Sequence, residues 1–230
     1  MRLNVDFTQE NGKNLFFTSD FHLFHKNVLK FDNRPFSDVN EMHIEIEKGW
    51  NEVVKPNDIV IYLGDLSFAR CEDKASVEAM LNRLNGTIHF VMGNHDKFED
   101  VKKMTRFQSV QDYLEVRVKH VLDYNEVETL FCCMHYPIYS WNKSHHGSYM
   151  VHGHSHMSLL NEESTWFSEM NSFCDFIPSD QLEKFKLLIA QKNYYNRRVF
   201  DVGIMGHGYK PVSYLDILAM ANNKTLSKHH

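Results

Sequence analysis

The chain has 230 residues, 43% hydrophobic and 24% charged, an ordinary balance for a globular protein with a substantial core. Its 25 Lys and Arg against 30 Asp and Glu give a net charge of −5, which excludes a generally basic nucleic-acid-binding surface. No apolar run approaches the roughly 18 residues that span a bilayer. The first residues, MRLNVDFTQENGK, lack the apolar stretch of a secretory signal. We therefore expect a cytoplasmic protein without membrane contacts.

The first half of the chain alternates short apolar runs, which predict buried strands, with amphipathic segments, which predict helices. The longest helix is expected to begin at Ser37 or Asp38 and to place Met42, Ile46 and Trp50 on one face. In chain order, the expected elements are a strand at 14–19, a helix to about 54, a strand at 59–63, a helix at 73–84, a strand at 87–92 and a short helix near 98–106.

The second half is richer in strands, which we expect at 114–121, 127–134, 149–151, 199–202 and 212–217. An α/β half followed by a β-rich half favours two sheets packed face to face with helices outside. One long segment, 158–198, interrupts this series of strands and contains an amphipathic stretch at 179–192. We interpret it as a helical insertion within a single domain of residues 1–230.

Potential metal ligands follow five of the expected strands. They are Asp20 and His22, Asp65, Asn94 with His95 and Asp96, His135, and His154 with His156. Polar groups at the carboxyl ends of strands converge in α/β proteins, although they are distant in sequence. By composition, the motif G-N-H-D at 93–96 is expected by chance about 0.004 times, and G-H-x-H at 153–156 about 0.04 times. Their joint appearance favours a metal site over a series of ordinary turn residues.

This series of motifs resembles the calcineurin-like metallophosphoesterase superfamily, in particular its small bacterial and phage-type phosphoesterases. The resemblance implies an α/β fold, a four-layer αββα sandwich of two mixed sheets flanked by helices, with two divalent metal ions at the strand ends. The implied ligands are Asp20, His22 and His156 for one ion, Asn94, His135 and His154 for the other, and Asp65 for both. His95 would face the leaving group of the substrate, and Asp96 would orient His95.

The chemistry of these residue types agrees with the implied roles. Two ions about 3.5–4 Å apart need a carboxylate that can use both oxygens, as Asp65 would. Imidazoles suit Mn, Fe, Zn or Ni. Such ions lower the pKa of water toward ~7, so that a bridging hydroxide could attack phosphorus while His95 protonates the departing alkoxide. The sequence thus predicts a dinuclear metal-dependent phosphoesterase.

Departures from the family pattern bear on the substrate. Phe68 stands where many members have Asp or Arg, and the G-D-x-V-D-R-G and G-N-H-E motifs of the superfamily's protein phosphatases are replaced. This favours a small phosphodiester, such as a cyclic or linear nucleotide, over a phosphoprotein or another monoester. Arg34 could grip a phosphate or be a surface arginine, and Tyr136 could stack on a base or pack in the core.

Two alternatives stay open. The first is a nuclease that acts on polynucleotide ends, and the charge of −5 weighs against extended contact with nucleic acid. The second is a catalytically silent protein that keeps the centre to bind metal or nucleotide. The presence of every expected ligand together with His95 weighs against this second alternative.

Overall fold

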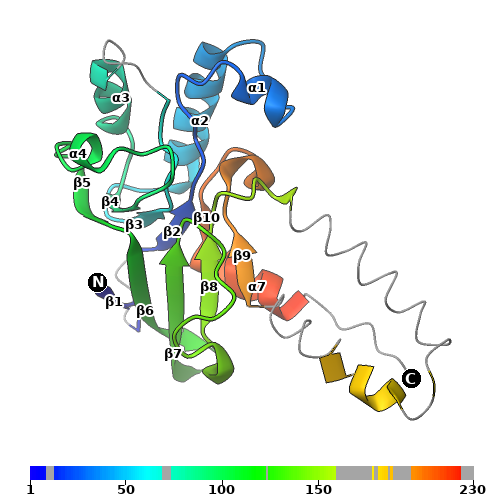
Figure 1. Ribbon diagram of the computed structural model, residues 1–230. Helices are drawn as coiled ribbons and strands as arrows, with labels where there is room; N and C mark the ends of the chain where they lie inside the picture. The colour runs from blue at the N-terminus through cyan, green and yellow to red at the C-terminus, as the bar shows by residue number, and fades with distance from the viewer. Residues whose placement is uncertain are drawn as a thin grey trace.

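Two five-stranded sheets form the centre of the protein. Its structure, a computed structural model, describes residues 1–8, 13–68, 74–122, 124–158, 178, 181–185, 187–188 and 198–223 (Figure 1). The first sheet has the spatial order β10 (Val212–Ser213), β2 (Leu15–Thr18), β3 (Ile59–Tyr62), β4 (Thr87–Val91) and β5 (Phe107–Gln111). The second has the order β1 (Arg2–Asp6), β6 (Tyr113–Leu122), β7 (Asn125–Met134), β8 (Tyr149–His152) and β9 (Val199–Asp201).

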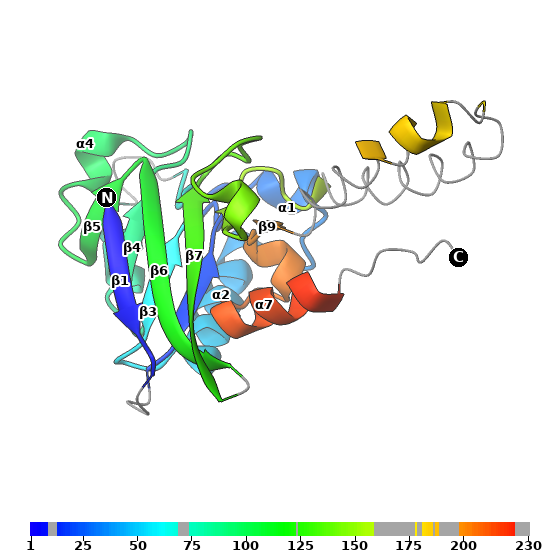
Figure 2. The ribbon, with the colours of Figure 1, turned by 90° about the horizontal axis from the view of Figure 1, so that it is seen from below.

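Both sheets are mixed, as predicted. Strands β2 to β5 are parallel, and β10 is antiparallel to β2. In the second sheet β6 and β7 form an antiparallel pair, whereas the other neighbours are parallel. Seen from below, the second sheet lies in front of the first (Figure 2).

The core between the sheets explains why β2 and β3 are continuously apolar. Phe17 and Ile61 belong to the apolar cluster that includes Phe131 of β7, and the rings of Phe17 and Phe131 lie 5.2 Å apart. Their neighbours Phe16 and Val60 belong to a second cluster on the opposite face of the same sheet. Both faces of these strands are therefore buried, which is the usual condition of parallel strands covered by helices.

Helices cover the outer face of the first sheet. In α2 (Val39–Val53), the predicted stripe of Met42, Ile46 and Trp50 is fully buried and joins α3 (Lys74–Leu81) in the same apolar cluster. Of the two short helices, α1 (Val28–Phe31) lies beside α2 and α4 (Phe98–Val101) lies beside β5 (Figure 1). The predicted α/β sandwich is confirmed.

The structure differs from the sequence-based expectations in several elements. The strand expected at 212–217 is wrong beyond β10, because α7 (Tyr214–Asn223) begins directly after it. Strands β1 and β5 were not predicted. Most of the expected insertion at 158–198 lies outside the described residues, although 181–185 are helical.

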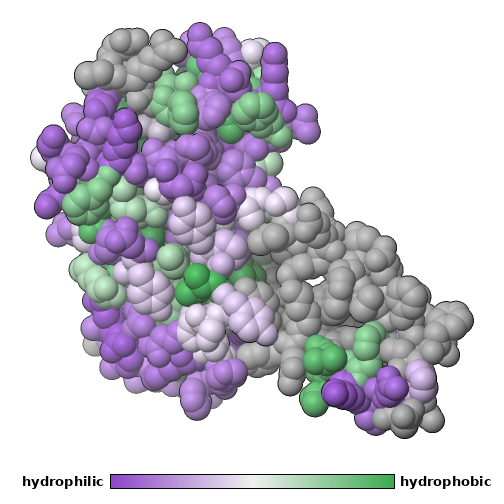
Figure 3. All heavy atoms as spheres, viewed as in Figure 1, coloured by the Kyte–Doolittle hydropathy of each residue, from purple (hydrophilic) through white to green (hydrophobic). Residues whose placement is uncertain are grey.

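The described surface is mostly hydrophilic on the face seen in Figure 3, with hydrophobic side chains in small patches. Among the described residues, no helix has the length and apolar character needed to cross a membrane.

Candidate metal centre

The candidate ligands meet at the carboxyl ends of strands from both sheets. Backbone hydrogen bonds tie the segments together: the Asp20 N–H donates to the Gly64 carbonyl at 3.0 Å, and the Gly153 N–H donates to the His135 carbonyl at 3.0 Å. The His154 N–H also donates to Asp20 Oδ2 at 3.1 Å, so residues 134 positions apart in the sequence share one small volume.

Asp20, His22 and His156 form the first ligand cluster. The Nε2 atoms of the two histidines lie 3.1 Å apart, and Asp20 Oδ1 lies 3.9 Å from His22 Nε2 and 3.6 Å from His156 Nε2. One carboxylate oxygen and two imidazole nitrogens thus point toward a common position.

Asp65, His135 and His154 form the second ligand cluster. Asp65 Oδ2 lies 3.5 Å from His135 Nε2 in this cluster and 3.6 Å from His22 Nε2 in the first. Asn94 joins the second cluster, because its Oδ1 lies 3.0 Å from His135 Nε2. The sequence-predicted ligands are therefore brought together, with Asp65 between the two groups.

Hydrogen bonds on the far side of two rings fix which nitrogen faces the centre. His135 Nδ1 is 2.7 Å from the Leu63 carbonyl, and His156 Nδ1 is 2.8 Å from Asp32 Oδ1. Both partners only accept hydrogen bonds at neutral pH, so each Nδ1 carries a proton and Nε2 is the nitrogen that faces the centre, where a bound ion would replace any proton on it.

Burial shifts the pKa values of Asp20 and His22 in the first cluster. It raises the pKa of Asp20 to about 7, although the Ser19 hydroxyl donates to this carboxylate at 2.6 Å. Burial also lowers the pKa of His22 to about 3, so this imidazole is neutral. Asp65 differs, because the hydrogen bond and charge of His135 outweigh its burial and hold its pKa at about 2.

This donor set fits two divalent cations. Buried carboxylates and neutral imidazole nitrogens that converge from several elements are the ligands that Mn, Fe, Zn or Ni prefer. A cation at each cluster would offset the cost of keeping Asp20 and Asp65 charged away from water.

Five of the candidate ligands have a left-handed backbone. The φ angles are +61° at Asp20, +51° at His22, +57° at Asp65, +66° at His154 and +48° at His156. Residues other than glycine rarely adopt this region, at a cost of roughly 1–3 kcal/mol each. The surrounding fold therefore holds the ligand loops in conformations that they would not choose alone.

Glycines allow these loops to approach one another closely. A Cβ at Gly153 would lie 2.6 Å from Asp20 Oδ2, and one at Gly64, where φ is +87°, would lie 2.5 Å from the Gly93 nitrogen. Both contacts are too short for any side chain, so only glycine permits this packing.

His95 lies at the open side of the centre. Its side chain is 38% exposed, its Nε2 is 4.0 Å from Asp65 Oδ2, and its backbone N–H donates to Asp65 Oδ1 at 2.9 Å. The backbone bond fixes the position of this residue, while the ring stays accessible to a molecule that enters the centre.

Asp96 does not orient His95 as expected. Its carboxylate accepts hydrogen bonds from three backbone N–H groups, those of Asp65 at 2.8 Å, Leu66 at 3.0 Å and Gly93 at 2.8 Å. Burial raises the pKa of Asp96, whereas these bonds favour its charged form. The residue therefore clamps the loop after β3 to the loop after β4, and it acts on the site through the backbone.

Arg34 is also placed differently from either expectation. Its buried guanidinium donates to the carbonyls of Phe21 at 2.8 Å and Asp20 at 2.9 Å, and to Asp32 Oδ2 at 2.9 Å. It is therefore neither a surface arginine nor available to grip a phosphate.

Sequence reasoning missed Asp32, which joins Arg34 to the ligand His156. The spacing of 124 residues between Asp32 and His156 offers no sequence signal.

Tyr136 lies beside the second cluster and not in the core. Its side chain is at the surface, with the residue 39% exposed, and its ring centroid is 4.7 Å from that of His154.

Comparisons with known proteins agree with this geometry. Residues 14–173 match the family model described as the calcineurin-like phosphoesterase superfamily domain. An uncharacterized protein of Methanocaldococcus jannaschii is 37% identical over 150 residues, which cover 65% of this chain and 73% of that protein. The gene 66 protein of Mycobacterium phage L5 is 26% identical over 166 residues, which cover 64% of this chain and 79% of the phage protein.

A solved structure has the same fold. A protein of unknown function from Aquifex aeolicus superposes with a TM-score of 0.57 at 20% identity, covering 90% of this chain and 99% of that one. The match to phage proteins confirms the phage-type resemblance seen in the sequence motifs.

Proposed function

Because the chain belongs to the calcineurin-like phosphoesterase superfamily, we propose that it is a dinuclear metal-dependent hydrolase of small phosphodiesters. The position of Asp65 carries this proposal. A single carboxylate oxygen lies 3.6 Å from a histidine of one ligand cluster and 3.5 Å from a histidine of the other. This is the arrangement that a pair of ions sharing one ligand requires.

The ions, when bound, would supply a nucleophile from water at neutral pH and would stabilise charge on the phosphoryl oxygens. Asp20, His22 and His156 would hold one ion, and Asn94, His135 and His154 the other. His95 would donate a proton from its ring to the leaving oxygen as the bond from phosphorus to that oxygen breaks. Tyr136, beside His154, would contact the part of the substrate above the second cluster.

The inward orientation of Arg34 supports a diester. A phosphomonoester carries one more negative charge than a diester, and a guanidinium commonly binds its two terminal oxygens together. Arg34 instead donates to Asp32 and to backbone carbonyls. It therefore offers no cation for the second charge of a monoester.

Turnover assays on metal-loaded protein test the proposal. Bis-p-nitrophenyl phosphate and p-nitrophenyl phosphate would be compared with added Mn²⁺, Zn²⁺, Fe²⁺ or Ni²⁺. We expect faster cleavage of the diester, and a loss of at least about 100-fold in kcat/KM for Asp65→Ala, because removal of the shared ligand disrupts both ion sites. The matched control is Glu47→Ala, which removes a carboxylate that pairs with Arg83 on the surface. A metal-loaded protein that is inert toward both esters would contradict the proposal.

A further inference from the structure

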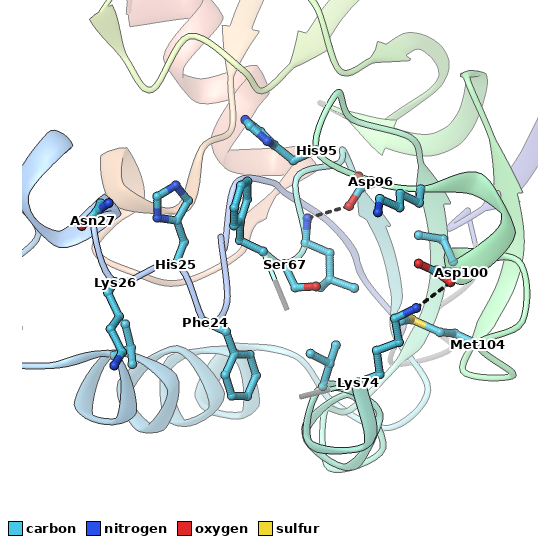
Figure 4. A pocket seen from close by; sticks show the side chains of 16 residues that line it. Phe24, His25, Lys26, Asn27, Ser67, Lys74, His95, Asp96, Asp100 and Met104 are labelled. Carbon is cyan, nitrogen blue, oxygen red and sulfur yellow. Dashed lines mark hydrogen bonds and ion pairs between the residues drawn. The ribbon is translucent and has the colours of Figure 1, made fainter. Parts of the chain in front are cut away.

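A hollow of about 900 Å³ opens beside His95, on the side formed by the segments around α1, α3 and α4. In Figure 4, His95 and Asp96 lie on one side of it, and His25 and Lys26 lie across from them. Because His95 lines this hollow and its Nε2 is 4.0 Å from Asp65 Oδ2, the hollow adjoins the candidate metal centre. We call it the His95 pocket, and its lining includes Phe24, His25, Lys26, Phe68, His95 and Lys97.

A row of rings leads from the metal centre into the His95 pocket. The ring centroids of His22 and His95 are 5.4 Å apart, those of His95 and Phe68 5.5 Å, and those of Phe68 and His25 4.6 Å. Phe68 is 53% exposed even though it lies among these rings. An exposed aromatic ring beside a catalytic centre offers a face on which a flat ring of the substrate can stack.

The charged side chains of the pocket leave positive charge at its rim. Lys74 is paired with Asp100 at 2.7 Å, and the carboxylate of Asp96 is engaged by three backbone N–H groups. Lys26 and Lys97 are exposed, and within the described part of the chain neither forms a close ion pair, although the charge of Lys97 helps to lower the pKa of Asp100. The pocket therefore suits a ligand that combines an aromatic ring with negative charge.

We propose that the His95 pocket binds the leaving group of the diester, and that this leaving group is a nucleoside or nucleotide whose base stacks on Phe68. The proposal rests on the proposed function, in which His95 protonates the leaving oxygen. The group attached to that oxygen must then lie on the His95 side of the centre. The volume falls within the roughly 300–1,000 Å³ of typical small-molecule pockets.

Binding of adenosine tests the pocket without turnover, because adenosine has no phosphoryl group to hydrolyse. Ligand-observed NMR titration of the metal-loaded full chain would compare wild type with Phe68→Ala, Phe68→Leu and a control, Tyr124→Ala. The control removes a fully exposed ring from the turn between β6 and β7. We expect the Phe68 variants to raise Kd about fivefold or more, the scale of one stacked base, and the control to match wild type. Equal affinity in wild type and both Phe68 variants would overturn the proposal.

A kinetic comparison links the pocket to the reaction. The substrates are thymidylyl-(3′→5′)-thymidine, whose leaving group carries a base, and glycerophosphoethanolamine, whose leaving groups are aliphatic. Phe68→Ala is expected to lower kcat/KM for the dinucleotide roughly tenfold and to change that for the aliphatic diester less than about twofold. Equal losses on both diesters would overturn the pocket and leave the proposed function standing. Adenosine binding that depends on Phe68, without hydrolysis of any diester, would support the pocket and reject the proposed function.

Discussion

Asp32 shows how a residue outside every motif can control a metal ligand. It accepts a hydrogen bond from His156 Nδ1 at 2.8 Å and is itself held by Arg34 at 2.9 Å. A carboxylate behind a ligating histidine fixes the ring and makes its other nitrogen a better ligand. Asp32 is therefore a positioning residue, and Arg34 supports it.

Replacement of Asp32 tests this positioning. We predict that Asp32→Asn weakens binding of the ion at the first cluster about 10- to 100-fold, because the amide carries no charge to hold the protonated Nδ1 of His156. Calorimetric titration with Mn²⁺ would show one weakened site and one near its wild-type affinity. Glu47→Gln is the matched control at the surface. Unchanged affinity at both sites would show that Asp32 has no positioning role.

If His95 donates a proton to the leaving oxygen, the loss of kcat on its replacement should depend on the leaving group. His95→Ala should lower kcat about 100-fold or more for an alkyl diester, because the departing alkoxide needs a proton. For bis-p-nitrophenyl phosphate the loss should be much smaller, since p-nitrophenolate leaves without one. Steady-state kinetics on both esters would measure this difference, and equal losses would contradict proton donation by His95.

The metal ligands could be predicted from the sequence because their types and motifs are distinctive. The contacts of the supporting residues could not be predicted, even for Asp96, which the motif singled out. Asp96 accepts three backbone hydrogen bonds, and this depends on how two loops meet in space. The left-handed backbone at Asp20 and His22 is likewise held by distant residues, because their N–H groups donate to the carbonyls of Gly64 and Asp65. Asp and His adopt this region more often than most residues, but still too rarely for the sequence alone to predict it.

At the scale of single elements, local signals determined where helices begin. Asp38, one of the two expected start residues, caps α2 by accepting hydrogen bonds from the N–H groups of Asn40 at 2.8 Å and Glu41 at 2.9 Å. We predict that Asp38→Ala lowers the free energy of unfolding by about 1 kcal/mol, because two N–H groups lose their acceptor. Urea denaturation would measure the change. Retention of wild-type stability would mean that solvent replaces the cap.

A local capping signal also explains why the strand expected at 212–217 is wrong beyond β10. Ser213 and Asp216 exchange hydrogen bonds: the Asp216 N–H donates to Ser213 Oγ at 3.1 Å, and the Ser213 N–H donates to Asp216 Oδ2 at 3.2 Å. This is a capping box, and it starts α7. The alternation of apolar residues in this segment indicated a strand, whereas the Ser-x-x-Asp spacing was the more informative signal.

At the scale of the whole molecule, two-sided burial made the architecture predictable. The apolar runs of β2 and β3 have no polar face, because helices cover one side and the second sheet covers the other. β1 was harder to predict, since four of its five residues are exposed or half-buried at the edge of a sheet. A strand with so little buried surface has little apolar pattern to detect.

Buried neutral histidines predict how the whole fold responds to acid. Burial lowers the pKa of both His89 and His120 in the folded protein, whereas unfolded histidine titrates near ~6.5. Below that pH the unfolded chain binds protons that the folded chain does not, so stability falls as the pH falls. His89→Gln should reduce the slope of unfolding free energy against pH by up to about 1.4 kcal/mol per pH unit. Urea denaturation at several acidic pH values would measure it, and a slope identical to wild type would contradict this account.

The two ligand clusters are the central feature of the site, and anomalous X-ray diffraction from crystals grown with Mn²⁺ tests them most directly. We predict two anomalous peaks about 3.5–4 Å apart, one beside Asp20, His22 and His156 and the other beside His135 and His154, with Asp65 between them. A single peak, or peaks away from these side chains, would contradict the dinuclear centre.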